Sequence, residues 1–105
     1  MGRYEGEFLV IGLGRFGGGL ASTLVELGHD VLGVDADPKL VQSFANVLTH
    51  VVEADSTDMD AMQQVGAGDF ATAVVAIGTD IEASILTTSV LVDLRVPKIV
   101  AKAVT

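Results

Sequence analysis

Short apolar runs alternate with longer amphipathic stretches from one end of the chain to the other. The apolar runs suit strands that are buried on both faces, and the stretches between them suit helices with one apolar side. This alternation is typical of repeated β-α-β units built around a parallel sheet. It predicts strands at residues 8–11, 31–34, 50–54, 72–77 and 99–103.

Residues that favour helix ends place helices between these strands. The helices are predicted at residues 15–27, from residue 38 onward, at 58–65 and at 81–94. Asp37 is suited to cap the second helix, because its carboxylate accepts a backbone amide and Pro38 fits the first helical position. Along the first helix, large apolar residues recur at helical spacing and are expected to face the sheet. These residues are Phe16, Leu20, Leu24 and Leu27.

Together these elements predict an α/β fold, a Rossmann-like doubly wound parallel sheet of about five strands with helices on both faces. A complete dinucleotide-binding sheet of this kind carries a sixth strand. We therefore expect residues 1–105 to form a single domain, either excised from a longer protein or a short member of its class. The helix at 81–94 is apolar around most of its circumference, which is typical of a helix buried on more than one side. We expect its second side to be a subunit interface rather than additional core.

Composition narrows the possible classes of function. Half of the 105 residues are hydrophobic and no cysteine is present, which excludes disorder, disulfides, thiol catalysis and cysteine-based metal sites. Fourteen acidic residues against six basic ones give a net charge of −8, which disfavours nucleic acids and anionic lipid surfaces as partners. No apolar run reaches the ~20 residues that span a bilayer, and residues 1–7 show no secretory pattern, so we expect a cytoplasmic protein.

The clearest motif is the glycine-rich segment GLGRFG at residues 12–17, directly after the first predicted strand and at the start of the first helix. In this context Gly12 permits a tight turn, Gly14 lets the backbone approach a pyrophosphate, and Gly17 allows close packing of helix and sheet. The helix N-terminus offers free amides and a partial positive charge to phosphates. The alternative is a glycine-rich turn that binds no ligand.

An acidic residue at the end of the second predicted strand strengthens the nucleotide hypothesis. Asp35 lies 18 residues after Gly17. A carboxylate at this place accepts hydrogen bonds from ribose hydroxyls and repels a 2′-phosphate. The expected ligands are therefore NAD(H), ADP or ATP rather than NADP.

Further candidates lie at the start of the first helix and at the ends of the other strands. Arg15 is either a solvated first-turn residue or a group that reaches added negative charge, directly or across a subunit boundary. Asp55 either accepts from an adenine amino group or, like Ser56, caps the following helix. The segment 76–80 belongs to the mouth of the expected crevice. Lys102 is a candidate for a ligand phosphate or a neighbouring carboxylate.

The complete set of candidate nucleotide-binding residues is Gly12, Gly14, Arg15, Phe16, Gly17, Asp35, Ala54, Asp55, Ala76, Gly78 and Lys102. No metal site and no catalytic group is predicted, because His29 and His50 have no plausible partner residues. The main alternative function is the NAD-binding domain of a dehydrogenase whose catalytic domain lies elsewhere. A third is a structural assembly module with a vestigial pocket.

Beyond the separate motifs, the chain resembles one family over nearly its whole length, from about residue 7 to residue 103. The segments FLVIGLGRFG, GHDVLGVD, ADSTD and VVAIGTDIEASILTT are similar to the N-terminal nucleotide-binding lobe of RCK or KTN (TrkA-N) domains, which regulate Trk- and Ktr-type potassium transport. The resemblance implies a cytosolic subunit that assembles, usually as a ring of dimers, beneath an integral membrane potassium channel or transporter. Binding of ATP, ADP or NAD(H) would change the shape of the ring and so open or close the pore.

By position, the resemblance assigns the phosphates to the three glycines of the loop, a terminal phosphate to Arg15, the ribose to Asp35 and the adenine to Asp55. It also places the helix at 81–94 in the surface between subunits. Many relatives carry Gly or Asn where Ala54 or Asp55 stands, which leaves the nucleotide preference open. The C-terminal lobe, in which such proteins often bind a second ligand, is not contained in residues 1–105.

Overall fold

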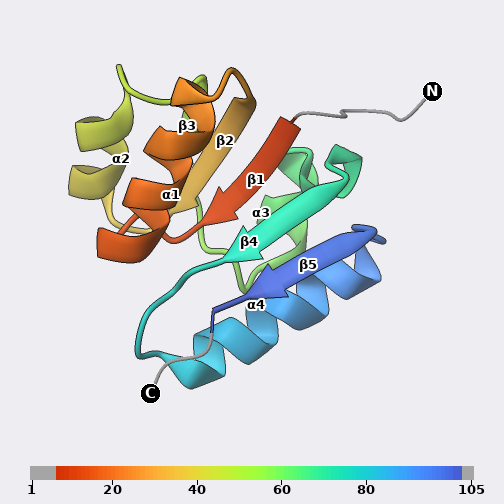
Figure 1. The fold of residues 1–105 in the computed structure, drawn as a ribbon. Coiled ribbons are helices and arrows are strands. Elements are labelled where there is room, and N and C mark those ends of the chain that lie inside the picture. Colours follow the sequence, from red (N-terminus) through yellow and green to blue (C-terminus); the bar gives the residue numbers. More distant parts are fainter. Residues whose placement is uncertain (1–6, 103–105) are drawn as a thin grey trace.

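The computed structural model describes residues 7–102, which build an α/β fold around one five-stranded sheet (Figure 1). All neighbouring strands are parallel, in the order β3-β2-β1-β4-β5. In chain order the elements are β1 (Glu7–Ile11), α1 (Arg15–Glu26), β2 (Asp30–Asp35), α2 (Pro38–Phe44), β3 (His50–Glu53), α3 (Met59–Gln64), the 3-10 helix η1 (Ala67–Asp69), β4 (Thr72–Val75), α4 (Ile81–Asp93) and β5 (Lys98–Ala101). Residues 1–6, which bear on the expected lack of a secretory signal, and Ala103, the predicted end of the last strand, lie outside the described residues.

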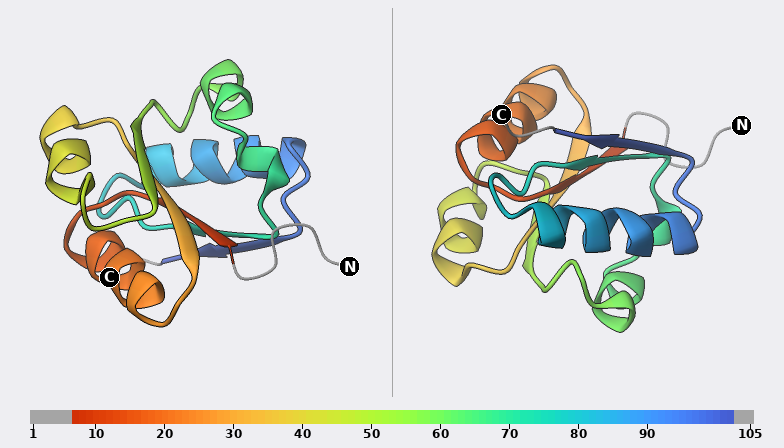
Figure 2. Two further views of the ribbon diagram at one scale, coloured as in Figure 1. Left: turned by 90° about the horizontal axis from the view of Figure 1, so that it is seen from above. Right: turned by 90° about the horizontal axis from the view of Figure 1, so that it is seen from below.

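Helices cover both faces of the sheet. α1 and α2 lie on one face, and α3 and α4 lie on the other (Figure 2). Connections between parallel strands are right-handed, so the helices change face where the strand order reverses, between β1 and β4. The predicted Rossmann-like parallel sheet with helices on both faces is therefore confirmed.

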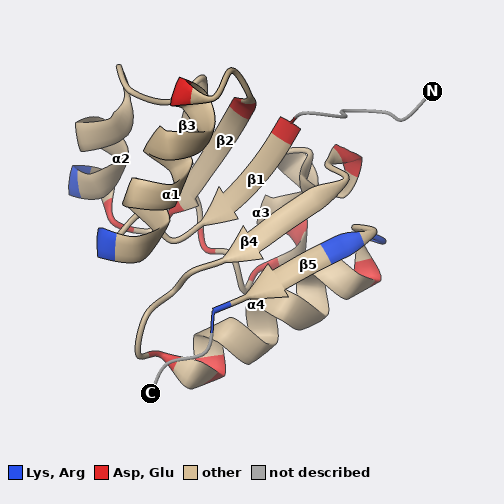
Figure 3. Ribbon diagram, in the orientation of Figure 1, with Lys and Arg blue, Asp and Glu red and all other residues tan. Residues whose placement is uncertain are grey.

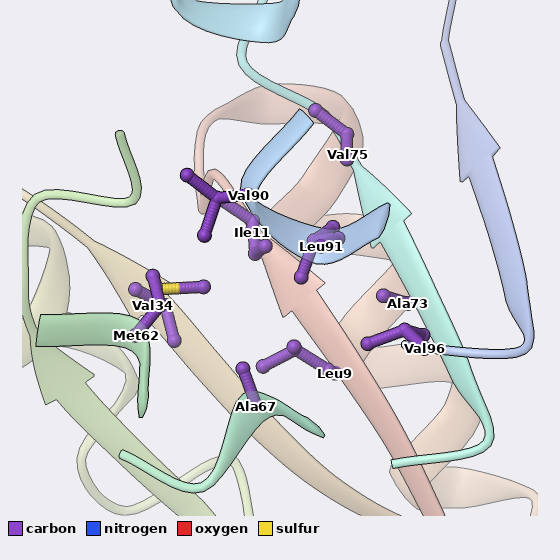
Figure 4. Packing of buried hydrophobic residues seen from close by; sticks show 10 residues of the cluster. All are labelled: Leu9, Ile11, Val34, Met62, Ala67, Ala73, Val75, Val90, Leu91 and Val96. Carbon is purple, nitrogen blue, oxygen red and sulfur yellow. The ribbon is translucent and has the colours of Figure 1, made fainter. Parts of the chain in front are cut away.

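β1 lies at the centre of the sheet and supplies both halves of the core. Its side chains alternate: Leu9 and Ile11 pack on the side of α3 and α4, and Val10 packs on the side of α1. On the α4 side the core residues are Leu9, Ile11, Val34, Met62, Ala67, Ala73, Val75, Val90, Leu91 and Val96 (Figure 4). Burial on both faces explains why this strand is continuously apolar instead of alternating with polar residues.

Aspartates cap three of the four α-helices within residues 7–102. Asp37 accepts a hydrogen bond from the amide of Lys39 at the start of α2. Asp58 and Asp80 act in the same way at the starts of α3 and α4. Each cap satisfies amides that the first turn of a helix leaves unpaired. The predicted cap at Asp37 is thus confirmed.

The buried side of α1 differs from the prediction. Phe16 and Leu27, expected to face the sheet, are 47% and 68% exposed. The buried residues of this helix are Gly17, Gly18 and Ala21. A helix face without large side chains lies closer to the sheet, so close packing selects this face over the one with the larger apolar residues. Leu24 is a member of the predicted set that does pack against the core.

The fourth strand is shorter than predicted. β4 ends at Val75 instead of residue 77. The amide of Ala76 still donates to the carbonyl oxygen of Ile11, but the chain then turns away from the sheet. Gly78 therefore lies in a loop at the edge where the strands end.

α4 is apolar around most of its circumference but only partly buried. The side that packs against the rest of the domain carries the buried residues Thr87, Val90 and Leu91. Elsewhere around this helix, large apolar residues are exposed: Ile81, Ile85, Leu86 and Val92. A subunit interface on these residues stays a prediction. Within residues 7–102, no helix is both long enough and apolar enough to cross a membrane.

Truncating the buried side of α4 is expected to cost far more stability than truncating its exposed side. Leu91→Ala removes a fully buried side chain and is expected to lower the free energy of unfolding by about 2–5 kcal/mol. Leu86→Ala, on the same helix but 48% exposed, is the matched control, with an expected loss below about 1 kcal/mol. Urea unfolding at low protein concentration measures both losses. Equal losses would contradict the orientation of α4.

Candidate functional site

The carboxyl ends of the strands meet at a crevice with a volume of about 600 Å³. It lies where the strand order reverses, which is the usual position of ligand sites in open α/β sheets. Ten of the eleven predicted nucleotide-binding residues line it, so five separate segments of the chain converge there. They are Gly12, Gly14, Arg15, Phe16, Asp35, Ala54, Asp55, Ala76, Gly78 and Lys102. Whether they bind a nucleotide stays a prediction.

The turn from β1 into α1 requires two residues without a Cβ atom. Gly12 has a φ of 96°, a left-handed conformation, and a Cβ there would collide with the carbonyl oxygen of Ala76. A Cβ at Gly17 would collide with the carbonyl oxygen of Gly12. Gly17, the one predicted residue that does not line the crevice, therefore brings the first turn of α1 against the loop. This is the packing role expected of the third glycine.

Gly14, the N-cap of α1, lacks a side chain for a different reason. A Cβ built at this position has no heavy atom within 4 Å, so the protein itself leaves the space open. α1 also begins without a side-chain cap and without an acidic residue in its first turn. Its first amides and its partial positive charge are therefore available to an anion in the crevice.

The Asp35 carboxylate holds two neighbouring loops of the crevice together. Its Oδ2 atom accepts a 2.8 Å hydrogen bond from the amide of Leu13 in the glycine-rich loop. Its Oδ1 atom accepts one of 2.8 Å from the amide of Asp37, just before α2. A carboxylate oxygen can accept two hydrogen bonds, and each oxygen of Asp35 accepts one of these two. Each therefore has room for a second hydrogen bond, from a ligand hydroxyl. Asp35 thus fixes the loop in addition to being the acid predicted to bind ribose.

Asp55 forms a small turn of its own after β3. Its Oδ1 atom accepts hydrogen bonds from the hydroxyl and the amide of Thr57, at 2.7 and 2.9 Å. The alternative role for Asp55 and Ser56, capping the next helix, is wrong, because Asp58 is the N-cap of α3. The hydroxyl of Thr57, and then its amide, hold the pKa of Asp55 below its ordinary value of 3.8. The carboxylate is therefore ionised at neutral pH and acts only as an acceptor.

Two cations line the crevice of this acidic protein. Arg15 begins α1 and Lys102 follows β5, and both residues are exposed. Figure 3 shows the basic positions at the start of α1 and after the end of β5 in blue. The Nζ atom of Lys102 lies 5.0 Å from the centre of the Phe16 ring, a cation–π contact between the residue after β5 and the first turn of α1. Both cations therefore stand beside the open start of α1, where they favour a negatively charged ligand.

Sequence reasoning missed some residues that line the crevice. Ser56 and Thr57 belong to the loop already singled out by Asp55, whereas Asp80 lies in the segment 76–80 that was predicted at the crevice mouth. Their positions just beyond strand ends were a usable signal. Leu40 carried no such signal, because it lies within α2 and reaches the crevice only through the packing of that helix.

The two histidines lie at the opposite edge of the sheet. His29 packs edge-to-face against Phe8 near the start of β1, with ring centroids 5.1 Å apart. His50 is the first residue of β3. Since the crevice is at the carboxyl ends of these strands, neither histidine lines it. In the described part of the chain, no three His, Cys, Asp or Glu residues are grouped so that they could hold a metal ion.

A parallel sheet in this order, with a glycine-rich turn and an acidic residue at the point of reversal, defines a Rossmann-like domain. Sequence comparison is more specific, since the family model of the TrkA-N domain matches residues 8–105. The chain belongs to the TrkA-N domain family. The family resemblance carried by its motifs is thereby confirmed.

Two similar proteins come from Bacillus subtilis (strain 168). Ktr system potassium uptake protein A is 43% identical over 104 residues, which cover 98% of this chain and 47% of that protein. Ktr system potassium uptake protein C is 45% identical over 97 residues, which cover 92% of this chain and 44% of that protein. The chain spans about half the length of these curated relatives.

Solved structures with low sequence identity share the fold. The NAD(P)-binding domain of an exopolyphosphatase-related protein from Archaeoglobus fulgidus has a TM-score of 0.84 at 23% identity, covering 98% of this chain and 75% of that chain. The Kef CTD from Shewanella denitrificans, in its AMP-bound form, has a TM-score of 0.77 at 24% identity, covering 92% and 58%. At these identities the likeness shows the fold alone.

Removing one donor to Asp55 is expected to raise its pKa. Thr57→Val keeps the backbone amide but deletes the hydroxyl, which is the larger cause of the lowered pKa. The ionised form then loses a hydrogen bond, so the pKa rises toward 3.8. Thr57→Ser keeps the hydroxyl and is expected to keep the pKa low. An NMR titration of the Asp55 carboxyl carbon measures the pKa in both variants. An unchanged pKa in Thr57→Val would contradict the hydrogen bond from the Thr57 hydroxyl to Asp55.

Proposed function

We propose that this crevice binds one adenine nucleotide, NAD(H), ADP or ATP, and that the domain is the nucleotide-responsive part of a cytosolic regulator of potassium uptake. The observation that carries the proposal is the pairing of Gly14 with Asp35. An uncapped helix start with open space lies beside an acidic residue that is bonded to the same loop. This pairing suits a phosphate group and the ribose attached to it.

The three parts of such a ligand match separate groups along the crevice. The diphosphate fits the open space at Gly14, where the amides of α1 are available. The ribose hydroxyls donate to Asp35, and the adenine amino group donates to the ionised Asp55. The volume of about 600 Å³ lies within the range of roughly 300–1,000 Å³ that is usual for small-molecule sites. A carboxylate at Asp35 also disfavours the extra phosphate of NADP.

The role in potassium uptake is supported by the two relatives whose names state it and whose identity to this chain is 43% and 45%. The proposed partner is an integral membrane potassium channel or transporter subunit, with this domain on its cytoplasmic side. The exposed apolar residues of α4 provide the surface through which copies of the domain pair as dimers or as rings of dimers. Exposed apolar side chains that gather on one element are typical of such interfaces.

A regulatory role suits the crevice better than hydride transfer does. Its titratable groups are aspartates, one arginine and one lysine, and the histidines lie at the other edge of the sheet. Hydride transfer requires a general acid or base beside the nicotinamide. We therefore propose that the domain acts by binding and that it catalyses no reaction.

Through Arg15, the kind of nucleotide that is bound can affect the geometry of the assembly. A ligand shifts an equilibrium between two shapes only when it binds one of them more tightly. ATP carries a terminal phosphate that ADP lacks, and Arg15 is an exposed cation at the start of α1. A contact between them, within one subunit or across a subunit boundary, would make the geometry of the assembly depend on which nucleotide is bound.

Filling the space at Gly14 is expected to block nucleotide binding without unfolding the domain. Gly14→Ala places a methyl group where the diphosphate is proposed to lie. The affinity for ADP is expected to fall at least ~10-fold, equivalent to ~1.4 kcal/mol. Gly19→Ala is the matched control, because this exposed position on α1 is equally open but lies outside the crevice. This control is expected to bind ADP normally and to gain about 0.5–1 kcal/mol of stability.

Isothermal titration calorimetry with ATP, ADP, NAD and NADH measures these affinities. Failure of the wild-type domain to bind any of the four would refute the proposed function. Normal ADP binding by Gly14→Ala would instead refute the position of the diphosphate.

Removing the charge of Arg15 is expected to reduce the discrimination between ATP and ADP. Arg15→Ala is expected to weaken the binding of ATP about 10-fold and the binding of ADP much less. The reason is that a hydrogen bond to a charged group contributes about 1.5–3 kcal/mol. Lys98→Ala makes the same change of charge at the start of β5, at the ends of the strands away from the crevice. It is expected to leave the ratio of the ATP and ADP affinities unchanged. The ratio of the two dissociation constants is the measurement. Equal losses for ATP and ADP in Arg15→Ala would contradict this role.

A further inference from the structure

A hydrogen bond between two hydroxyl groups joins the crevice to α4. The Oγ atom of Ser56 and the Oγ1 atom of Thr87 are 2.6 Å apart, although the residues are separated by 31 positions in the chain. Ser56 lines the crevice in the loop between β3 and α3. Thr87 lies in the middle of α4 and is completely buried. The bond therefore runs from the wall of the proposed nucleotide site into the core.

Thr87 is a costly place for a hydroxyl group unless that group is bonded. It shares its buried helix face with Val90 and Leu91, which supply no polar partner. The neighbouring Thr88 satisfies its hydroxyl within α4 by donating to the carbonyl oxygen of Ser84. Thr87 instead pairs with Ser56 across the gap between two elements. If the Ser56 loop or α4 moved away, the buried hydroxyl of Thr87 would lose its bond to Ser56. The positions of the loop and of α4 therefore depend on each other.

The rest of this loop is held mainly by bonds within itself. Asp55 bonds to Thr57, and the amide of Asp58 donates to the carbonyl oxygen of Asp55. At its start, the amide of Ala54 donates to the carbonyl oxygen of Asp35 on β2. These bonds shape the turn, but the contact with Thr87 is what ties the Ser56 side chain to the buried side of α4.

We propose that Thr87 is a positioning residue for nucleotide binding: through Ser56 it holds the loop that presents Asp55 to the adenine. The inference rests on the proposed function for the identity of the ligand. A nucleotide that requires the loop in this place also favours the matching place of α4, and the effect is reciprocal. Since α4 also carries exposed apolar residues, the bond connects the ligand site with the helix proposed to contact a second copy of the chain.

Two substitutions at Thr87 separate positioning from stability. Thr87→Val keeps the branched shape and deletes the hydroxyl, so the bond to Ser56 is lost. Thr87→Ser keeps the hydroxyl and removes a buried methyl group, so stability falls while the bond can form. Hydrogen exchange of the amides of residues 55–57 in the ligand-free domain reports the order of the loop, and calorimetry with ADP reports binding.

In Thr87→Val we expect exchange in the loop to quicken several-fold and the affinity for ADP to fall about 10-fold. Thr87→Ser is expected to keep the wild-type exchange rates and affinity despite its lower melting temperature. Ser56→Ala is expected to match Thr87→Val, and the double variant is expected to show no further loss, because both changes remove the same bond.

Unchanged loop exchange in Thr87→Val would overturn the positioning role, whatever the nucleotide affinities are. Additive losses in the double variant would also overturn it. If the wild-type domain binds no nucleotide, the proposed function and the adenine part of this inference fail. In that case the exchange data still decide whether Thr87 holds the loop.

Discussion

The backbone contact at the first turn of α1 is the constraint on which the crevice depends. Gly12 and Gly17 approach each other and Ala76 so closely that neither position has room for a Cβ atom. The contact presses the start of α1 against the ends of β1 and β4, and Asp35 ties the same loop to β2. The groups that offer amides to a ligand are therefore positioned by core packing, and a small displacement of α1 would separate them.

Charge is arranged around this contact in a consistent way. Aspartates complete the first turns of α2, α3 and α4, whereas α1 begins at Gly14 without a side-chain cap. A protein with a net charge of −8 thus leaves one helix start free beside two cations, Arg15 and Lys102. The carboxylates of Asp35 and Asp55 face the same space as acceptors. An adenine nucleotide carries both kinds of group, acceptors on its phosphates and donors on its ribose and base, and it suits such a divided site.

α4 links the two halves of the proposed function. Leu91 and Val90 pack it against the core, other apolar residues on it are exposed, and Thr87 contacts the loop beside the crevice. Two binding sites of a protein can be coupled through an element whose position both of them influence. In the described chain, α4 contacts the loop beside the crevice through Thr87, and its exposed apolar residues are the surface proposed to contact a second copy.

Local patterns predicted much of this molecule. Continuous apolar runs and helix-end residues predicted the order of strands and helices, because they depend on side-chain period and on backbone conformation over a few residues. Since parallel strands end at one edge of the sheet, the same reasoning brought ten of the eleven candidate residues to one crevice. The family was also evident from these motifs, and the comparison confirmed it.

Other features were decided by the tertiary structure. The periodicity of α1 favoured Phe16 and Leu27 as its buried face, but contact with the sheet selected the smaller residues. Asp55 and Ser56 were the alternative caps for α3, but the path of the loop places Asp58 at the start of that helix. The bonds from Asp35 to Leu13 and from Ser56 to Thr87 join residues 22 and 31 positions apart. The sequence alone determined the order of the elements and the edge of the sheet where the candidate site lies. Which faces are buried and which polar groups meet was settled only on folding, because close packing and the cost of unpaired buried groups act between residues that are distant in the chain.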